Sequence, residues 1–267
     1  MSSSELNFYP FVIATCFYLL VFVIAELTRK LVDKYGTNGS LLFYFLMELI
    51  ATTQMCTCVY ENAVIIRHYG LLGFFFIVAL LIFSGGIMNR EAFVSPLVPI
   101  ELYYKGIFPL RRLLVTIAGE MVGGYSAYWL ARSLWYWSLN LLSDHALFYQ
   151  LTSCKLTYKV SFLFVPCFEV IGCFLMRSIL CHIPLNIKKY MAPVVVSSLL
   201  TFMTFSALLF VGVPGLNPTV ASSRLQGCDG LNTIWFILTY WVCPIIGWML
   251  SVAFDDYRIT VAEKKTK

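Results

Sequence analysis

The sequence predicts an all-α protein that crosses a membrane several times, and three observations support this. Of its 267 residues, 60% are hydrophobic and 12% are charged, whereas a soluble domain carries about 25% charged residues. Apolar runs of about 20 residues, long enough for a helix to cross a bilayer, recur along the chain. Lys and Arg gather in alternate linkers, as expected for loops on the cytoplasmic side. The seven apolar runs are 8–28, 41–60, 70–88, 110–131, 161–181, 191–213 and 232–254.

The first run, 8–28, is interpreted as an extra membrane segment ahead of the main membrane domain at 41–254. The seven residues before it contain Glu5 and no Lys or Arg, which is unlike a cleaved signal peptide. If the 29–40 linker is cytoplasmic, 14 Lys and Arg lie on the cytoplasmic side and 5 on the other. The net charge of +5 reflects this asymmetry and the basic cytoplasmic tail at 255–267, and it does not indicate nucleic-acid binding.

A short helix is predicted to begin directly after the sixth run, at Gly215-Leu216-Asn217-Pro218-Thr219. Asn is a strong helix N-cap, and Pro is favoured at the first helical position. A helix that starts at membrane depth points unpaired N–H groups and a partial positive charge at what precedes it. Such a start is tolerated only beside a water-filled cavity or inside protein, so the pattern indicates a pore.

Two parts of the chain share this pattern. The second run holds Glu48 and the fifth holds Glu169; Asn89 follows the first by 41 residues, and Asn217 follows the second by 48. An odd number of spans separates the units, which predicts inverted repeats over about 41–133 and 161–254. A carboxylate is costly in lipid, so both acids are expected to be buried structural residues, bonded to the backbone of the re-entrant loops.

The first unit departs from the second at the helix start. Arg90 and Glu91 follow Asn89, in the places that Pro218 and Thr219 take after Asn217. Arg opposes the partial positive charge of a helix start, so Arg90 is expected either to pair with Glu91, to turn away, or to narrow the pore. Ser95-Pro96 is a competing cap pair that would start the half-helix six residues later.

Six motifs follow one another along the chain: Glu48–Thr52, Ser84–Asn89, Gly106–Arg112 with Ala118–Glu120 and Gly123, Glu169, Gly215–Thr219, and Tyr240–Gly247. Taken in this order, they make the sequence resemble the aquaporin family. The fourth run is the least apolar, since it contains Arg111, Arg112 and Glu120, the last where the family usually has Gln. The extra first run and Cys228, nine residues after Thr219, resemble the divergent superaquaporin branch.

The resemblance implies six transmembrane helices and two re-entrant half-helices whose boxes, Asn89-Arg90-Glu91 and Asn217-Pro218-Thr219, meet in a pore. It also implies a homotetramer in the plasma membrane or endoplasmic reticulum membrane, with no cofactor, metal or enzymatic activity. Val220 stands where the family usually has Arg, so the filter would be apolar and pass water, glycerol or hydrogen peroxide. The filter positions carried over by offset are Tyr69, Thr204 or Phe205, Pro214 and Val220.

Two rival interpretations remain. A seven-helix receptor would also show seven apolar runs, but it requires neither a capped half-helix nor paired intramembrane Glu residues. An aquaporin-like protein that conducts nothing is favoured by Arg90 and Glu91.

Overall fold

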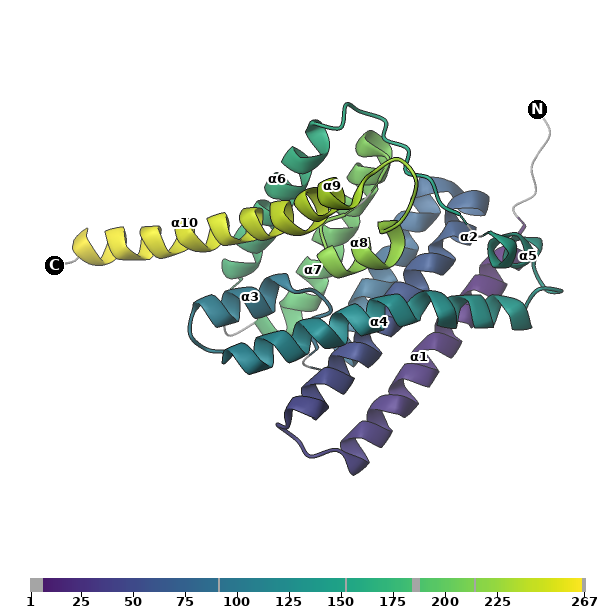
Figure 1. Cartoon of the computed structure of the whole chain (residues 1–267), viewed down its shortest axis with the longest axis horizontal. Coiled ribbons are helices and arrows are strands. Elements are labelled where there is room, and N and C mark those ends of the chain that lie inside the picture. The colour runs from purple at the N-terminus through teal and green to yellow at the C-terminus, as the bar shows by residue number, and fades with distance from the viewer. Residues whose placement is uncertain (1–6, 91, 152, 184–187, 214, 266–267) are drawn as a thin grey trace.

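The computed structural model describes residues 7–90, 92–151, 153–183, 188–213 and 215–265, and these are mostly helical (Figure 1). Most of each of the seven apolar runs lies in a helix. In the described residues, β-pairing is limited to one isolated bridge between Lys155 and Asp229. The helices are α1 (Tyr9–Tyr35), α2 (Leu41–Met88), α3 (Leu97–Tyr104), α4 (Leu110–Trp137), α5 (Ser143–Gln150), α6 (Phe164–Cys181), α7 (Lys188–Ser206), η1 (Ala207–Val211), α8 (Pro218–Leu225), α9 (Thr233–Ile237), η2 (Leu238–Val242) and α10 (Cys243–Lys265).

The second and third apolar runs both belong to α2, which is broken at Gly70. This residue has φ 65° and ψ −165°, a conformation open to glycine because it lacks a Cβ. Arg90, just after the end of α2, contacts Glu26 and Asp33 near the end of α1. Since that end of α1 leads directly into the start of α2, the part of α2 after Gly70 must run back toward its own beginning.

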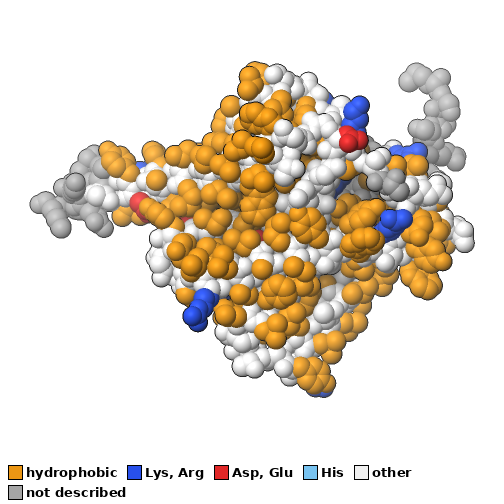
Figure 2. Space-filling model, in the orientation of Figure 1, with side chains coloured by type: hydrophobic (Ala, Val, Ile, Leu, Met, Phe, Trp, Pro, Cys, Tyr) orange, Lys and Arg blue, Asp and Glu red, His pale blue; other side chains and the backbone are white. Residues whose placement is uncertain are grey.

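Five helices in the described part are long and apolar enough to cross a membrane, with α2 counted once. α4, which contains Arg111, Arg112 and Glu120, is not among them. On the face shown in Figure 2, hydrophobic side chains cover most of the surface and charged ones are sparse. Leu72, Phe76 and Leu80 of α2 are 66%, 63% and 60% exposed. Large exposed apolar surfaces mark contact with another apolar phase, which for these helices is the lipid.

The extra helix α1 is an integral part of the bundle. Phe17, Tyr18 and Val21 are buried in one cluster with Val64 and Ile65 of α2. Polar contacts reinforce this packing: the Tyr18 hydroxyl donates to Asn62 Oδ1 at 2.7 Å, and the buried Arg29 donates to Gln54 Oε1 at 2.8 Å. The first apolar run therefore forms a helix that packs against α2 through both apolar and polar contacts.

α5 is attached to this bundle through a buried polar cluster. His145 and Glu61 are both fully buried, with Nε2 and Oε1 3.0 Å apart. Trp135 of α4 donates to the other carboxylate oxygen at 2.7 Å, and Ser138 Oγ lies 2.7 Å from His145 Nδ1. Because buried polar groups are costly unless they are bonded, this cluster fixes the position of α5 against α2 and α4.

A disulfide joins Cys154, before α6, to Cys228, just after α8. The adjacent backbone pairs as well, since Leu156 N donates to Asp229 O and Asp229 N donates to Cys154 O, both at 2.9 Å. Disulfides persist in oxidising compartments. The side predicted from the Lys and Arg distribution to face away from the cytosol is therefore the side that carries the disulfide.

We expect Cys228→Ser to reduce stability by about 2–4 kcal/mol, because the disulfide constrains a long segment of the unfolded chain; the two cysteines are 74 residues apart. Thermal unfolding in detergent measures this loss. Cys154→Ser should give the same loss and the double variant no more, while Cys167→Ser, at an exposed free cysteine, should have little effect. Equal stability of the Cys228 variant and the wild type would contradict the expectation.

Candidate functional site: two opposed half-helices

The second half-helix begins where the sequence predicts. α8 starts at Pro218, and Asn217 is its N-cap, whose Oδ1 accepts from Thr219 N at 3.0 Å and Val220 N at 3.5 Å. The cap pair thus satisfies two of the N–H groups that a helix start leaves unpaired.

The first half-helix begins at a different place from the one expected. Asn89 is the C-cap of α2, and its backbone N–H donates to Gly85 O. α3 starts at Leu97, directly after Ser95-Pro96, so the expectation of a helix start at Asn89 was wrong and the helix starts close to the competing position. The physical reason is that the helical hydrogen bonds of α2 continue up to Asn89. The N-cap of α3 is Pro96, and no side chain makes a cap hydrogen bond there.

Arg90 turns away from both half-helices. It has φ 51°, and its guanidinium binds the carboxylates of Glu26, at 2.9 Å, and Asp33 on α1. The extra N-terminal helix therefore supplies the partners that neutralise this arginine. Glu91 lies outside the described residues.

The two buried acids hold the residues just before each half-helix. Glu48, 3% exposed, accepts from the backbone N–H of Phe93 at 2.9 Å and of Val94 at 3.1 Å. Glu169, fully buried, accepts from Leu216 N at 2.6 Å. Each carboxylate thus satisfies loop N–H groups that have no strand or helix partner, which is the structural arrangement expected from the sequence.

The two half-helix starts share one backbone feature and are in contact. Val94 and Leu216, the residues before Ser95 and Asn217, both take the left-handed conformation, with φ 58° and 66°, which is rare for branched and bulky side chains. Asn217 Nδ2 donates to Val94 O at 2.8 Å. Figure 1 shows α3 and α8 among the long helices. The N-terminal ends of the two short helices therefore meet.

The polar residues Ser95 and Asn217 differ from their neighbours in exposure. Both are half-buried, whereas the residues on either side of them in the chain, Val94 and Pro96, and Leu216 and Pro218, are buried. At each half-helix start one polar residue thus remains partly accessible while the apolar residues around it are packed.

With this geometry established, known proteins were compared with the chain. It is 35% identical over 276 residues to "Putative aquaporin-10" of Caenorhabditis elegans, covering 99% of this chain and 96% of that protein. The chain belongs to the aquaporin family. It is 26% identical to "Aquaporin-11" of Milnesium tardigradum over 98% of this chain and 94% of that protein. No family model matches.

A solved structure has the same fold as this aquaporin. The aquaglyceroporin of Plasmodium falciparum superposes with a TM-score of 0.57 at 15% identity, over 84% of this chain and 99% of that one. Together with aquaporin-11 and aquaporin-12 relatives, this confirms the aquaporin-like helical fold and a divergent, superaquaporin-like branch of a channel family. The protein is a multi-pass membrane protein, and the seven-helix receptor interpretation is wrong.

A third buried acid contacts the second box of this aquaporin. Glu120 of α4 is fully buried, and its Oε2 accepts from Thr219 Oγ1 at 3.3 Å. Thr219 is itself fully buried. The Thr in the box therefore provides a hydroxyl donor for the Glu on α4, which an Ala at this position could not do.

The filter residues predicted by offset lie on separate elements. Tyr69 ends the first part of α2, and its hydroxyl donates to Asn7 O at 2.6 Å and accepts from Phe11 N at 2.9 Å, so it is bound to the N-terminal segment. Thr204 and Phe205 lie on α7, and Phe205 packs edge-on against Phe75. Val220 is half-buried in the first turn of α8, and Pro214 lies outside the described residues. The filter itself stays a prediction.

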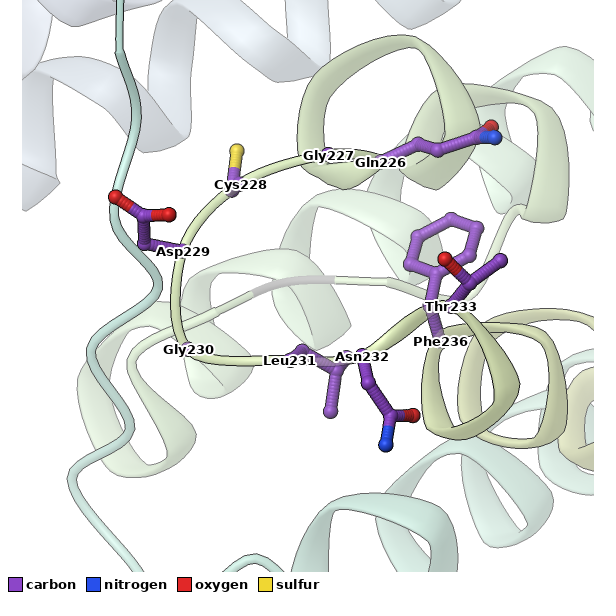
Figure 3. Close-up of a pocket in the computed structure, with 9 residues that line it drawn as sticks. All are labelled: Gln226, Gly227, Cys228, Asp229, Gly230, Leu231, Asn232, Thr233 and Phe236. Carbon is purple, nitrogen blue, oxygen red and sulfur yellow. The ribbon is translucent and has the colours of Figure 1, made fainter.

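The loop after α8 curls around a pocket of about 430 Å³ (Figure 3). Cys228 and Asp229 lie on one side of the curl and Thr233 and Phe236 on the other. Sequence analysis singled out Cys228 and missed its partner Cys154, because nine cysteines leave many pairings open. The disulfide fixes this loop, and hence the end of α8, to the segment before α6.

The first half-helix start also had a signal in the sequence. Ser95 follows Glu48 by 47 residues, and Asn217 follows Glu169 by 48, whereas Asn89 follows Glu48 by only 41. Since an internal repeat should keep its spacing, the matched interval favours Ser95-Pro96. A start assigned from the residue type of Asn89 alone does not take this spacing into account.

Proposed function

We propose that this aquaporin is a passive channel for water or small neutral solutes such as glycerol and hydrogen peroxide. The observation that carries the proposal is the contact between the starts of α3 and α8, with Ser95 and Asn217 partly accessible beside it. Both helix starts point partial positive charge at this place. Such a waist repels cations and protons and leaves neutral molecules as the solutes that can pass.

The amide of Asn217 can serve a passing solute. One of its two N–H groups is bonded to Val94 O, and an amide nitrogen carries two donors. The second N–H and the Ser95 hydroxyl supply hydrogen bonds that compensate a water or a hydroxyl group for lost hydration. Val220 adds an apolar side chain one turn along α8 and no charge, which favours a less water-selective pore.

The non-conducting alternative was based on Arg90 and Glu91, and the position of Arg90 supports conduction instead. That side chain is bound to Glu26 and Asp33, while Glu91 lies outside the described residues. We further propose a homotetramer of the channel unit 41–254 in the plasma membrane or endoplasmic reticulum membrane; chemical cross-linking in native membranes would test the assembly.

The direct test of conduction is transport in proteoliposomes that contain the purified full chain. We expect stopped-flow light scattering to show faster water or glycerol flux than in empty vesicles, or an entrapped dye to show faster hydrogen peroxide entry. Asn217→Ala should reduce the flux, because the cap and the contact with Val94 are lost together, and Asn89→Ala should not. Rates equal to those of empty vesicles for all three solutes would defeat the channel proposal.

A further inference from the structure

α3 is held on one face by α6 and α10. Leu97, at the start of α3, is 2% exposed and is buried in a cluster with Cys173 and Trp248. Glu101 lies four residues later, on the same face of the helix. The first half-helix is therefore fixed at two points, by an apolar contact at its start and by a carboxylate one turn further on.

The carboxylate of Glu101 is bonded by three donors. Arg177 Nη2 lies 2.9 Å from Oε1, Lys105 Nζ lies 2.9 Å from Oε1, and Trp248 Nε1 donates to Oε2 at 2.7 Å. Arg177 comes from α6 and is 4% exposed. It also donates to Asp255 Oδ2 of α10 at 3.1 Å and to Ser251 O at 3.3 Å. One buried arginine thus links α3, α6 and α10.

The second half-helix has no equivalent ion pair among the described residues. α8 is held by hydrogen bonds without an ion pair: Ser223 Oγ donates to Gly124 O at 2.7 Å, Trp241 Nε1 donates to Ser222 Oγ at 2.9 Å, and Thr219 Oγ1 donates to Glu120 Oε2 at 3.3 Å. Arg177 lies eight residues after Glu169, and the residue eight after Glu48 is Cys56. Among the described residues, an ion pair therefore holds one half-helix and not the other.

We propose that Glu101 and Arg177 are positioning residues that set how closely the start of α3 approaches Asn217, and thereby which solutes pass. This rests on the proposed channel function. Arg177 joins α3 to α10 through two carboxylates, those of Glu101 and Asp255. Removing the charge of Glu101 leaves Arg177 paired with Asp255 alone, so the arginine no longer holds α3 through an ion pair. α3 has only eight residues, so rearrangement at Glu101 moves its whole length and, with it, Ser95 just before its start.

Glu101→Gln is the decisive variant, because it removes the charge and keeps an oxygen for Trp248. Asp256→Asn is the matched control, since Asp256 is an exposed carboxylate on α10 that takes no part in the contacts of Glu101 and Arg177. Two measurements are made in lipid vesicles with the full chain. One is the ratio of glycerol to water permeability. The other is the rate at which a small water-soluble thiol reagent modifies Ser95→Cys, read at that site by mass spectrometry.

We expect Glu101→Gln to change the modification rate of Ser95→Cys by about tenfold, the order expected when a hydrogen bond to a charged group is weakened, and to alter the permeability ratio. Arg177→Met should act in the same direction, and the two changes together should add little. An unchanged rate and a parallel fall in both permeabilities would mean fewer folded channels and would overturn the proposal. If the wild type conducts nothing, the channel function fails, and the modification rate still decides whether Glu101 and Arg177 position α3.

Discussion

Gly247→Ala should lower the melting temperature of the purified protein by about 2–12 °C, the shift expected when overpacking costs about 1–3 kcal/mol in a chain of this size. A Cβ at Gly247 of α10 would overlap the Val170 carbonyl of α6. Backbone atoms cannot move aside as a flexible side chain can, so α6 and α10 would have to separate. Because Val170 follows Glu169, this separation also disturbs the carboxylate that holds Leu216.

The matched control is Gly86→Ala, another helical glycine. There a Cβ would meet only Pro193, at an ordinary 3.4 Å, and Ala is the better helix former by about 1 kcal/mol. We expect its melting temperature to equal or exceed that of the wild type. If Gly247→Ala has the same melting temperature as Gly86→Ala, α6 and α10 do not pack as closely as described.

Glu169→Leu should prevent the accumulation of a monodisperse folded protein. The substitution removes the acceptor of Leu216 N at 2.6 Å and leaves a backbone N–H unpaired in a fully buried place. Each such group costs several kcal/mol at membrane depth. Size-exclusion chromatography in mild detergent measures the outcome, as the fraction of protein that elutes in a single symmetrical peak.

Glu169→Gln separates a structural role from one that needs the charge. Gln has nearly the same shape and keeps a carbonyl oxygen that can accept from Leu216 N. We expect it to fold like the wild type and to conduct at a similar rate. Failure of both variants to fold would assign a role to the charge itself, and normal folding of Glu169→Leu would contradict the structural account.

Much of the fold followed from the pattern of apolar residues. Seven runs gave seven helical segments, because a helix is the simplest way to satisfy the backbone in lipid. Asn217-Pro218 located the start of α8, since the cap signal is local and depends on two residue types. Glu48 and Glu169 pointed to the re-entrant loops because an isolated carboxylate in an apolar run requires a partner.

The remaining features depend on contacts between distant residues. Arg90 could not be placed without α1, which supplies Glu26 and Asp33. His145 is isolated along the chain, and its pairing with Glu61 depends on α5 folding back over α2. The start of α3 was misplaced because Asn89 has the residue type of a cap, while the helix that precedes it continues far enough to include it.

The central claim is that the pore is formed where Ser95-Pro96 and Asn217-Pro218 meet, and cysteine block tests it most directly. Ser95→Cys and Asn89→Cys are each reconstituted and treated with a water-soluble methanethiosulfonate, and the permeability to the conducted solute is compared with that of the treated wild type. We predict that treatment reduces the permeability of Ser95→Cys and leaves Asn89→Cys at the wild-type level. Block of Asn89→Cys with no effect on Ser95→Cys would contradict the account.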